Sequence, residues 1–282
     1  MNQVFSFTRW WMLVTRHWME NRKRYMLALL AIAGLMVAWY GFVMMMNGDR
    51  TLALIFQFMA YYVGLYFVGC LYASTMFGEL SSKPQGVSYL TVPASQLEKL
   101  CCVLFFGVVL FFIAYTLIFY IVDIPMVQLS RRLIAQRHLG WDELTSPEHS
   151  VYVYNIFTGI GGPIPDRDWH LFLVSYFSIQ SAFILGSVYF TRYAFLKTIV
   201  AILLFMLVAV CFITKVIRDH LPAGWRFGGN MLEWIQLDAM GAQEKLVRLP
   251  NSISLFLIWL TICGIPLLFW VITYVRLKEK EV

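Results

Sequence analysis

The sequence has few charged residues and lacks the motifs of several enzyme classes. Only 13% of its residues are charged, whereas a soluble protein carries about 25%. It contains no Gly-Lys dipeptide, so the phosphate-binding loop G-x-x-x-x-G-K-[ST] of many nucleotide hydrolases does not occur. No H-E-x-x-H zinc motif and no G-x-S-x-G nucleophile motif is present either. The chain therefore has no recognisable motif for hydrolysing ATP, and it has too little charge for a typical soluble fold.

Cysteines are also few, and charged residues are scarce at the centres of the long apolar runs. The five cysteines all lie in apolar runs and form no C-x-x-C pair, so we interpret them as packing residues. Acids and bases are almost absent from the centres of those runs, which argues against a proton-coupled pump and an intramembrane protease. Asp123 stands at the end of one run, and we interpret it as a solvated residue with no relay function.

Six apolar runs dominate the chain, which is 60% hydrophobic. About 20 apolar residues cross a bilayer as a helix, whereas barrel strands would appear as alternating segments of about 10 residues. The sequence therefore predicts an all-α integral membrane protein with six transmembrane helices. The predicted spans are 25–46, 52–77, 97–122, 169–190, 196–217 and 253–275.

Residues 1–24 precede the six-helix domain (25–282) and have an amphipathic pattern. At 100° per residue, one face is apolar and the opposite face is basic. The apolar stripe consists of Phe7, Trp10, Trp11, Val14 and Trp18. The basic residues opposite are Arg9, Arg16 and Lys23. This pattern predicts an interfacial "elbow" helix, with tryptophan at headgroup depth and arginine facing water and anionic lipid. It does not resemble a secretory signal peptide.

The distribution of charge predicts the orientation. With the N-terminus in the cytoplasm, the cytoplasmic segments hold twelve of the 22 Lys and Arg residues but five of the 16 acidic ones. Both termini are then cytoplasmic, and residues 129–168 and 218–252 form outer loops. Within the second loop, the apolar stretch 231–237 is interpreted as an interfacial or re-entrant helix. The basic composition is explained by orientation, so no nucleic-acid partner is expected.

The segment 78–97 is the polar interruption between the second and third spans. Pro84 suits the first turn of a short surface helix. Ser95 and Glu98 form an S-x-x-E capping box directly before the third span. We interpret this segment as a cytoplasmic contact surface for another protein, although an ordinary connecting loop is the alternative.

The residues of this segment carry a resemblance to a known family. The run 89–99, YLTVPASQLEK, resembles the YL-x-LP-x-S-x-x-EK pattern of permease subunits of type-2 ABC transporters, with Val92 in place of the usual leucine. The order of elbow helix, six spans and cytoplasmic segment extends the resemblance over the whole chain. Residues 183–198 also resemble exporter-like permeases of Bacteroidota-type bacteria.

The resemblance implies a multi-pass subunit in a bacterial cytoplasmic (inner) membrane. It would pair with a second permease chain, identical or different, and be driven by a separate ABC ATPase that binds ATP and magnesium. The chain itself would bind no cofactor or metal and would have no catalytic residue. The residues expected to contact the ATPase are Glu79, Lys83, Gly86, Tyr89, Leu90 and Pro93.

Two other classes of function remain open at this point. One is a scaffold or sensor that has the same fold but transports nothing, which measured ATP-dependent flux would exclude. The other is a membrane enzyme or enzyme accessory, which would require acid–base or metal-binding residues at one depth. Convergence of Asp123, His170 and His220 on a pocket would favour that alternative.

Overall fold

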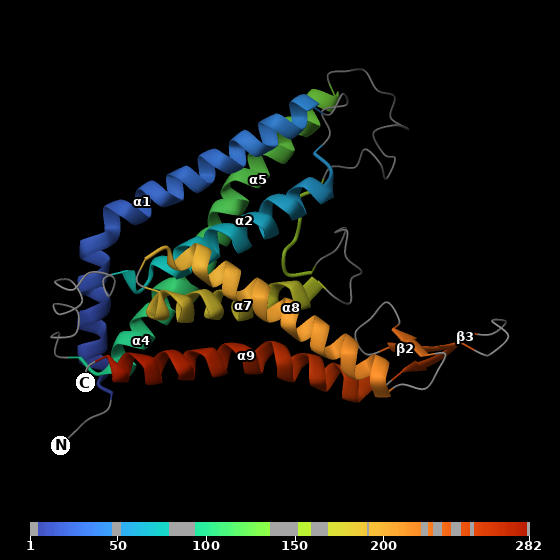
Figure 1. Ribbon diagram of the computed structural model, residues 1–282. Coiled ribbons are helices and arrows are strands. Elements are labelled where there is room, and N and C mark those ends of the chain that lie inside the picture. Colours follow the sequence, from blue (N-terminus) through green and yellow to red (C-terminus); the bar gives the residue numbers. More distant parts are fainter. Residues whose placement is uncertain are drawn as a thin grey trace.

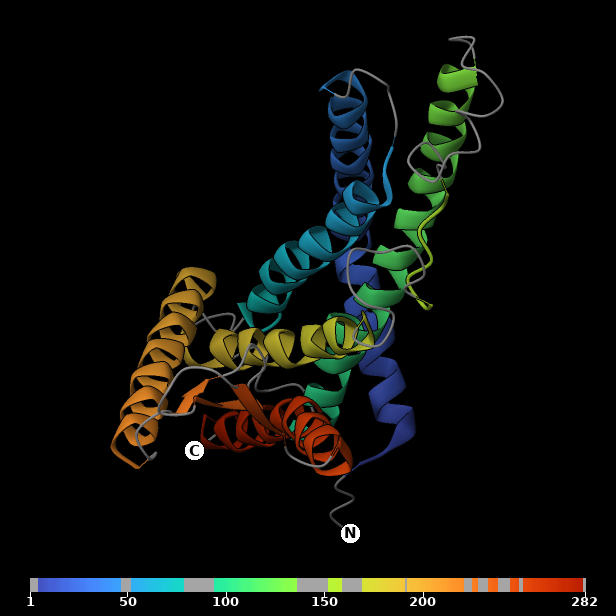
Figure 2. The ribbon, with the colours of Figure 1, turned by 90° about the vertical axis from the view of Figure 1, so that its right-hand side faces the viewer.

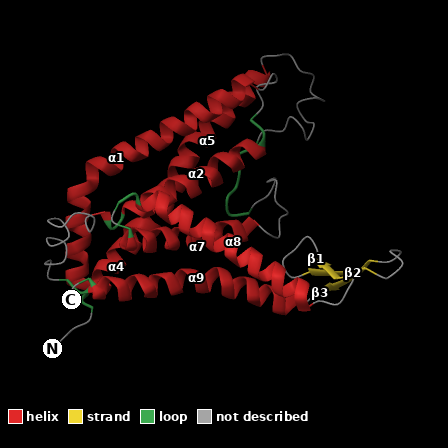
Figure 3. Cartoon of the chain, in the orientation of Figure 1, coloured by secondary structure: helices red, strands yellow, loops and turns green. Residues whose placement is uncertain are grey.

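In the computed structural model, the described residues form six helices of sufficient length and apolar character to cross a membrane (Figures 1 and 3). Their number and the all-α class of the membrane part agree with the sequence prediction. The structure describes residues 5–46, 52–78, 94–135, 152–158, 169–190, 192–220, 225–227, 233–237, 244–248 and 251–280.

The helix boundaries follow the predicted spans closely, except that the first and third helices are longer. The first, second, fourth, fifth and sixth spans lie in α1 (Phe7–Met46), α2 (Leu54–Thr75), α7 (Trp169–Tyr189), α8 (Ala194–His220) and α9 (Asn251–Glu279). The third consists of α4 (Gln96–Leu104), the π-helical turn η2 (Phe105–Leu110) and α5 (Phe111–Ala135). Helix α5 continues through Pro125, beyond the predicted end of the span.

Helix α7 is central to one half of the molecule, where it packs against α2, α8 and α9. Helix α1 packs along α5 in the other half, and α2 contacts both halves (Figure 2). The start of α1, the end of α2, the start of α4 and the end of α9 lie near one another in Figure 1. The elements that flank the predicted cytoplasmic segment are therefore gathered at one end of the bundle.

The predicted elbow helix and the first span form one continuous helix, α1. Its axis changes direction in the first half, so that the early turns run at a steep angle to the remainder (Figure 1). Since no Pro breaks the backbone hydrogen bonds there, the two parts are joined by helical backbone. A displacement of the early turns would thus pass directly to the first span.

A small antiparallel sheet lies between α8 and α9, and it corrects the predicted helix at 231–237. Its strands are β1 (Trp225–Phe227), β2 (Glu233–Leu237) and β3 (Glu244–Arg248), in that order. Arg226 pairs with Ile235, and Trp234 pairs with Val247. The helical interpretation was wrong because it counted apolar residues. A short run containing aromatic and β-branched residues between turn signals also fits a strand.

Small residues on α2 allow two buried tyrosines to approach its backbone. A Cβ atom at Gly64 would lie 2.2 Å from the Tyr115 hydroxyl oxygen, and one at Gly69 would lie 2.7 Å from that of Tyr176. Tyr115 and Tyr176 are both buried, and the Tyr115 hydroxyl donates towards the carbonyls of Ala60 and Tyr61 at 3.1 Å each. Close helix contact through small residues, which the sequence indicated for this span, is therefore realised in α2.

Candidate functional site

The predicted partner-binding segment is described only at its two ends. Gly78 follows α2, and Ala94 precedes the cap of α4. The six residues predicted to contact an ATPase lie outside the described residues, namely Glu79, Lys83, Gly86, Tyr89, Leu90 and Pro93. The site is therefore built from the residues that hold the C-terminal end of this segment.

Ser95 and Glu98 form the predicted capping box at the start of α4. The Glu98 backbone N–H donates to the Ser95 hydroxyl at 3.2 Å, and the Ser95 backbone N–H donates to Glu98 Oε2 at 2.8 Å. The two bonds satisfy backbone donors that a helix start otherwise leaves without partners. The end of the 78–97 segment is thus fixed rigidly to the third span.

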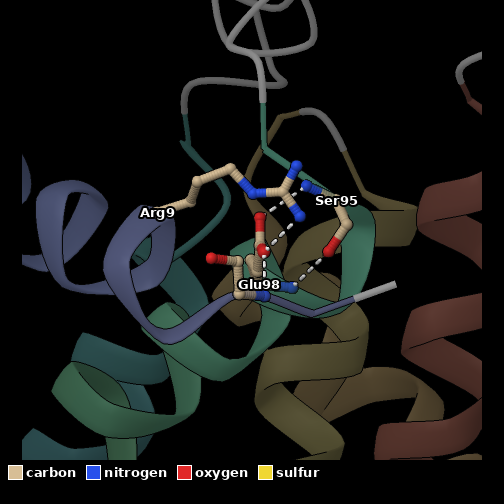
Figure 4. A network of polar contacts seen from close by, with 4 residues as sticks. Arg9, Ser95 and Glu98 are labelled. Carbon is tan, nitrogen blue, oxygen red and sulfur yellow. Dashed lines mark hydrogen bonds and ion pairs between the residues drawn. The ribbon is translucent and has the colours of Figure 1, made fainter. Parts of the chain in front are cut away.

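Glu98 also connects α4 to the N-terminal part of the chain (Figure 4). Its Oε1 atom accepts from the Ser6 backbone N–H at 2.7 Å and from Arg9 Nη2 at 3.0 Å. The Glu98 side chain has no exposed surface, whereas that of Arg9 is 39% exposed. A buried carboxylate is stable only when hydrogen bonds and an opposite charge offset its lost hydration. Glu98 has both, so it joins α1 and α4 at one point.

Apolar contacts extend this junction along the early turns of α1. The Trp10 ring packs edge-on against Phe105 with centroids 5.7 Å apart, and Val14 is buried in a cluster with Cys102 and Phe106. About two turns beyond Trp10 on α1, the centroid of the His17 ring lies 4.7 Å from that of the Phe106 ring. The first part of α1 is consequently packed on α4 and η2, and the ion pair also joins it to α4.

The predicted interfacial residues have different environments in the structure. Trp11 and Trp18 are largely exposed, at 54% and 43%, as a bilayer-facing stripe requires. Trp10 instead packs against the protein. Arg16 pairs with Glu20 at 2.8 Å on the exposed side of α1. Arg9, predicted to face water and anionic lipid, keeps 39% of its side chain exposed and also pairs with Glu98, 89 residues away in the chain.

Searches of protein-family models, curated proteins and solved structures found no match to this chain.

A second polar contact lies deeper, at the π-helical turn η2. The wider turn of a π-helix leaves carbonyl groups available, and such turns are frequent at functional sites. The buried Gln180 of α7 donates its amide N–H to the Gly107 carbonyl of η2. A Cβ atom at Gly107 would lie 3.2 Å from the Met76 sulfur, so the small residue lets α2 approach this turn. The third span is thus tied to α1 at its start and to α7 at η2.

At the opposite end of the bundle, residues 152–157 are bound to the helices by Gln57. The Gln57 amide group donates to the Tyr152 carbonyl, and its oxygen accepts from the Tyr154 backbone N–H, both at 2.8 Å. The Ile156 N–H donates to the Tyr120 hydroxyl at 3.2 Å. Tyr154 and Ile156 are buried. Residues 152–157 of the predicted outer loop therefore pack on the start of α2 and on Tyr120 of α5.

Replacing Gln57 by leucine is expected to release residues 152–157. The variant leaves the Tyr154 N–H and the Tyr152 carbonyl without their partner, at a cost of about 1–3 kcal/mol for each group that stays buried. Limited proteolysis should then cut this segment several-fold faster than in the wild type. Gln128→Leu is the control, because Gln128 is exposed on α5. Equal cleavage of both variants would contradict the assignment.

The sequence identified the cap but missed the residues that connect distant segments. One sequence signal could have identified these residues: each is a polar residue in a helix that is largely apolar. They are Arg9, Gln57 and Gln180. A polar residue in an apolar helix needs a buried partner. Their partners lie 73–97 residues away, however, and the chain spacing does not identify them. In the described residues, no group of three His, Cys, Asp or Glu side chains is arranged to hold a metal.

Proposed function

We propose that this chain is the membrane-spanning permease subunit of an ABC-type transporter, acted on by a separate ATPase at the 78–97 segment. The observation that carries the proposal is the Glu98 junction. One buried carboxylate joins the end of this segment to both the third span and the N-terminal helix. The resemblance of residues 89–99 to type-2 ABC permeases identifies the kind of partner.

The junction gives a physical route for transmitting movement. A protein that pushes or pulls on residues 78–94 acts on Ser95, the first residue held by the capping box. Because Glu98 binds Ser95, Ser6 and Arg9 together, α4 and the early turns of α1 move as one unit. Helix α1 continues unbroken into the first span, and the third span contacts α7 through Gly107. Movement at one surface is thereby distributed to three spans.

The remaining parts of the proposal follow from the resemblance. A second permease chain, identical or different, would complete the translocation pathway, and ATP with magnesium would bind to the ATPase. The chain would reside in a bacterial cytoplasmic membrane with both termini in the cytoplasm. Six apolar helices make it a multi-pass membrane protein, and the excess of cations in the proposed cytoplasmic segments supports that orientation.

Co-purification of an ABC ATPase with this chain from its native host tests the proposal. The double variant Gly86→Trp, Tyr89→Ala should reduce ATPase recovery at least tenfold, because it alters the predicted contact surface without touching the Glu98 junction. Met45→Ala, exposed at the opposite end of α1, is the control and should retain recovery. Unchanged recovery with the double variant would refute the contact assignment. ATP-dependent flux in proteoliposomes distinguishes a transporter from a scaffold with the same partner.

A further inference from the structure

The Asp123 carboxyl group lies inside the protein, not in solvent as its position near the end of the third apolar run indicated. Asp123 is in the middle of α5 and has no exposed surface. Both carboxyl oxygens are buried, and among the described residues neither is in hydrogen-bond geometry with a donor. A buried acid without partners is rare in proteins and calls for a specific explanation.

A tyrosine hydroxyl group lies beside Asp123. The side chain of Tyr40 on α1, which is also fully buried, faces Asp123 across the α1–α5 contact, and the Tyr115 hydroxyl lies near Tyr40 in turn. Phe119, Val122 and Val127 are buried in the same cluster. Asp123 therefore sits among apolar side chains and tyrosine hydroxyls.

The described elements packed around Asp123 provide no positive charge. The part of α1 beyond Arg24, all of α2, η2 and residues 152–158 contain no Lys, Arg, Asp or Glu. The cations of α5 are Arg131 and Arg132, which are exposed and begin eight residues beyond Asp123. Eight residues of α-helix correspond to about 12 Å along the axis. The Arg131 guanidinium lies over the Tyr152 ring, 5.8 Å from its centroid, rather than at the acid.

An ionised carboxylate in these surroundings would lose its hydration without gaining a cation or a sufficient set of donors. That loss costs several kcal/mol per ion even after relaxation. A protonated carboxyl group has no net charge, and its O–H can donate to the Tyr40 oxygen after a small rotation. We propose that Asp123 is a proton-binding site, occupied when α1 is packed on α5 and emptied when the two helices separate and water reaches the carboxyl group.

The step consists of one protonation. A proton from water binds a carboxylate oxygen of Asp123 as the helices close, and the same O–H bond breaks to return the proton to water as they open. In water an aspartate loses its proton near pH 4, so the open form is ionised at neutral pH. The closed form thus holds one more proton, and rising pH favours the open form. This inference is independent of the proposed ATPase partner.

Infrared spectroscopy of the full chain in lipid tests the proton directly. At about pH 5, where an aspartate in water is ionised, the spectrum of the wild type minus that of Asp123→Asn should contain the C=O stretch of a protonated carboxyl group. Tyr40→Phe, which leaves the acid in place, should shift this band without removing it. A difference spectrum with only carboxylate bands would overturn the proposal. If Asp123→Asn does not fold, a shift of the protonated band between the wild type and Tyr40→Phe carries the same test, and identical spectra of these two proteins would overturn the proposal.

The link to helix packing has a separate readout. As the pH rises from acid towards neutral, the ratio of unfolded or opened protein to closed protein should increase for the wild type. This increase should exceed that of Asp123→Asn by up to about tenfold per pH unit. The asparagine side chain has nearly the shape of the neutral acid, but it cannot ionise in this pH range. Parallel pH profiles of the two proteins would refute the coupling.

Discussion

Glu98→Ala is expected to lower the free energy of unfolding by about 3 kcal/mol and to release the early turns of α1 from α4. The substitution removes the acceptor of three donors, the backbone N–H groups of Ser6 and Ser95 and the Arg9 guanidinium. Loss of one partner from a buried ion pair costs about 3–5 kcal/mol. We take the lower limit because the Arg9 side chain is 39% exposed and regains water. Thermal unfolding in detergent measures the change.

The matched control is Glu20→Ala. Glu20 also pairs with an arginine of α1, but both side chains of the Arg16–Glu20 pair are about half exposed, at 53% and 49%. Exposed pairs of this kind contribute less than about 1 kcal/mol. Equal destabilisation by the two substitutions would mean that the Glu98 junction does not hold α1 to α4.

Glu98→Gln separates shape from charge at the same site. Its amide oxygen can still accept from Ser6 and Arg9, but its NH₂ group then faces the Ser95 N–H, where two donors oppose each other. We expect Glu98→Gln to lower the free energy of unfolding, but by less than Glu98→Ala does. Faster proteolysis of the first part of α1 should follow the same order among the variants.

The sequence predicted the helices well because each span is a local property. Twenty consecutive apolar residues identify a membrane helix without knowledge of its neighbours. The second span was predicted at 52–77 and forms Leu54–Thr75; the fourth was predicted at 169–190 and forms Trp169–Tyr189. The cap of α4 was equally local, because Ser95 and Glu98 are three residues apart.

The contacts of the candidate site are not local, and this is why the sequence did not yield them. Arg9 was predicted to face water and anionic lipid because helical periodicity places it opposite the tryptophans, and periodicity cannot indicate a partner at residue 98. Asp123 was assigned to solvent because it follows an apolar run. The run continues as α5 to Ala135, so the acid is interior to a helix that packs on α1. The Asp123 prediction was wrong, and the Arg9–Glu98 pair was missed, because the environment of each side chain was inferred from its own segment alone.

Gly186→Ala is expected to separate α7 from α8 and to lower the free energy of unfolding by about 2 kcal/mol. A Cβ atom at Gly186 would lie 1.9 Å from the Thr198 hydroxyl oxygen and 2.9 Å from its Cβ and Cγ2 atoms. The buried Thr198 side chain is stiff at χ1, and its hydroxyl donates to the Ala194 carbonyl at 2.7 Å. Overpacking of this kind costs about 1–3 kcal/mol. Thermal unfolding in detergent is again the measurement.

A second glycine in a helix interior gives the opposite expectation. A Cβ atom at Gly264 of α9 would meet nothing within 4 Å. Gly264→Ala should therefore raise stability by up to about 1 kcal/mol, since alanine is the better helix former. In the double variant Gly186→Ala, Thr198→Ala, removal of the hydroxyl and methyl groups should restore part of the loss. Equal changes in stability for Gly186→Ala and Gly264→Ala would mean that Gly186 does not set the distance between α7 and α8. The absence of any recovery in the double variant would mean the same.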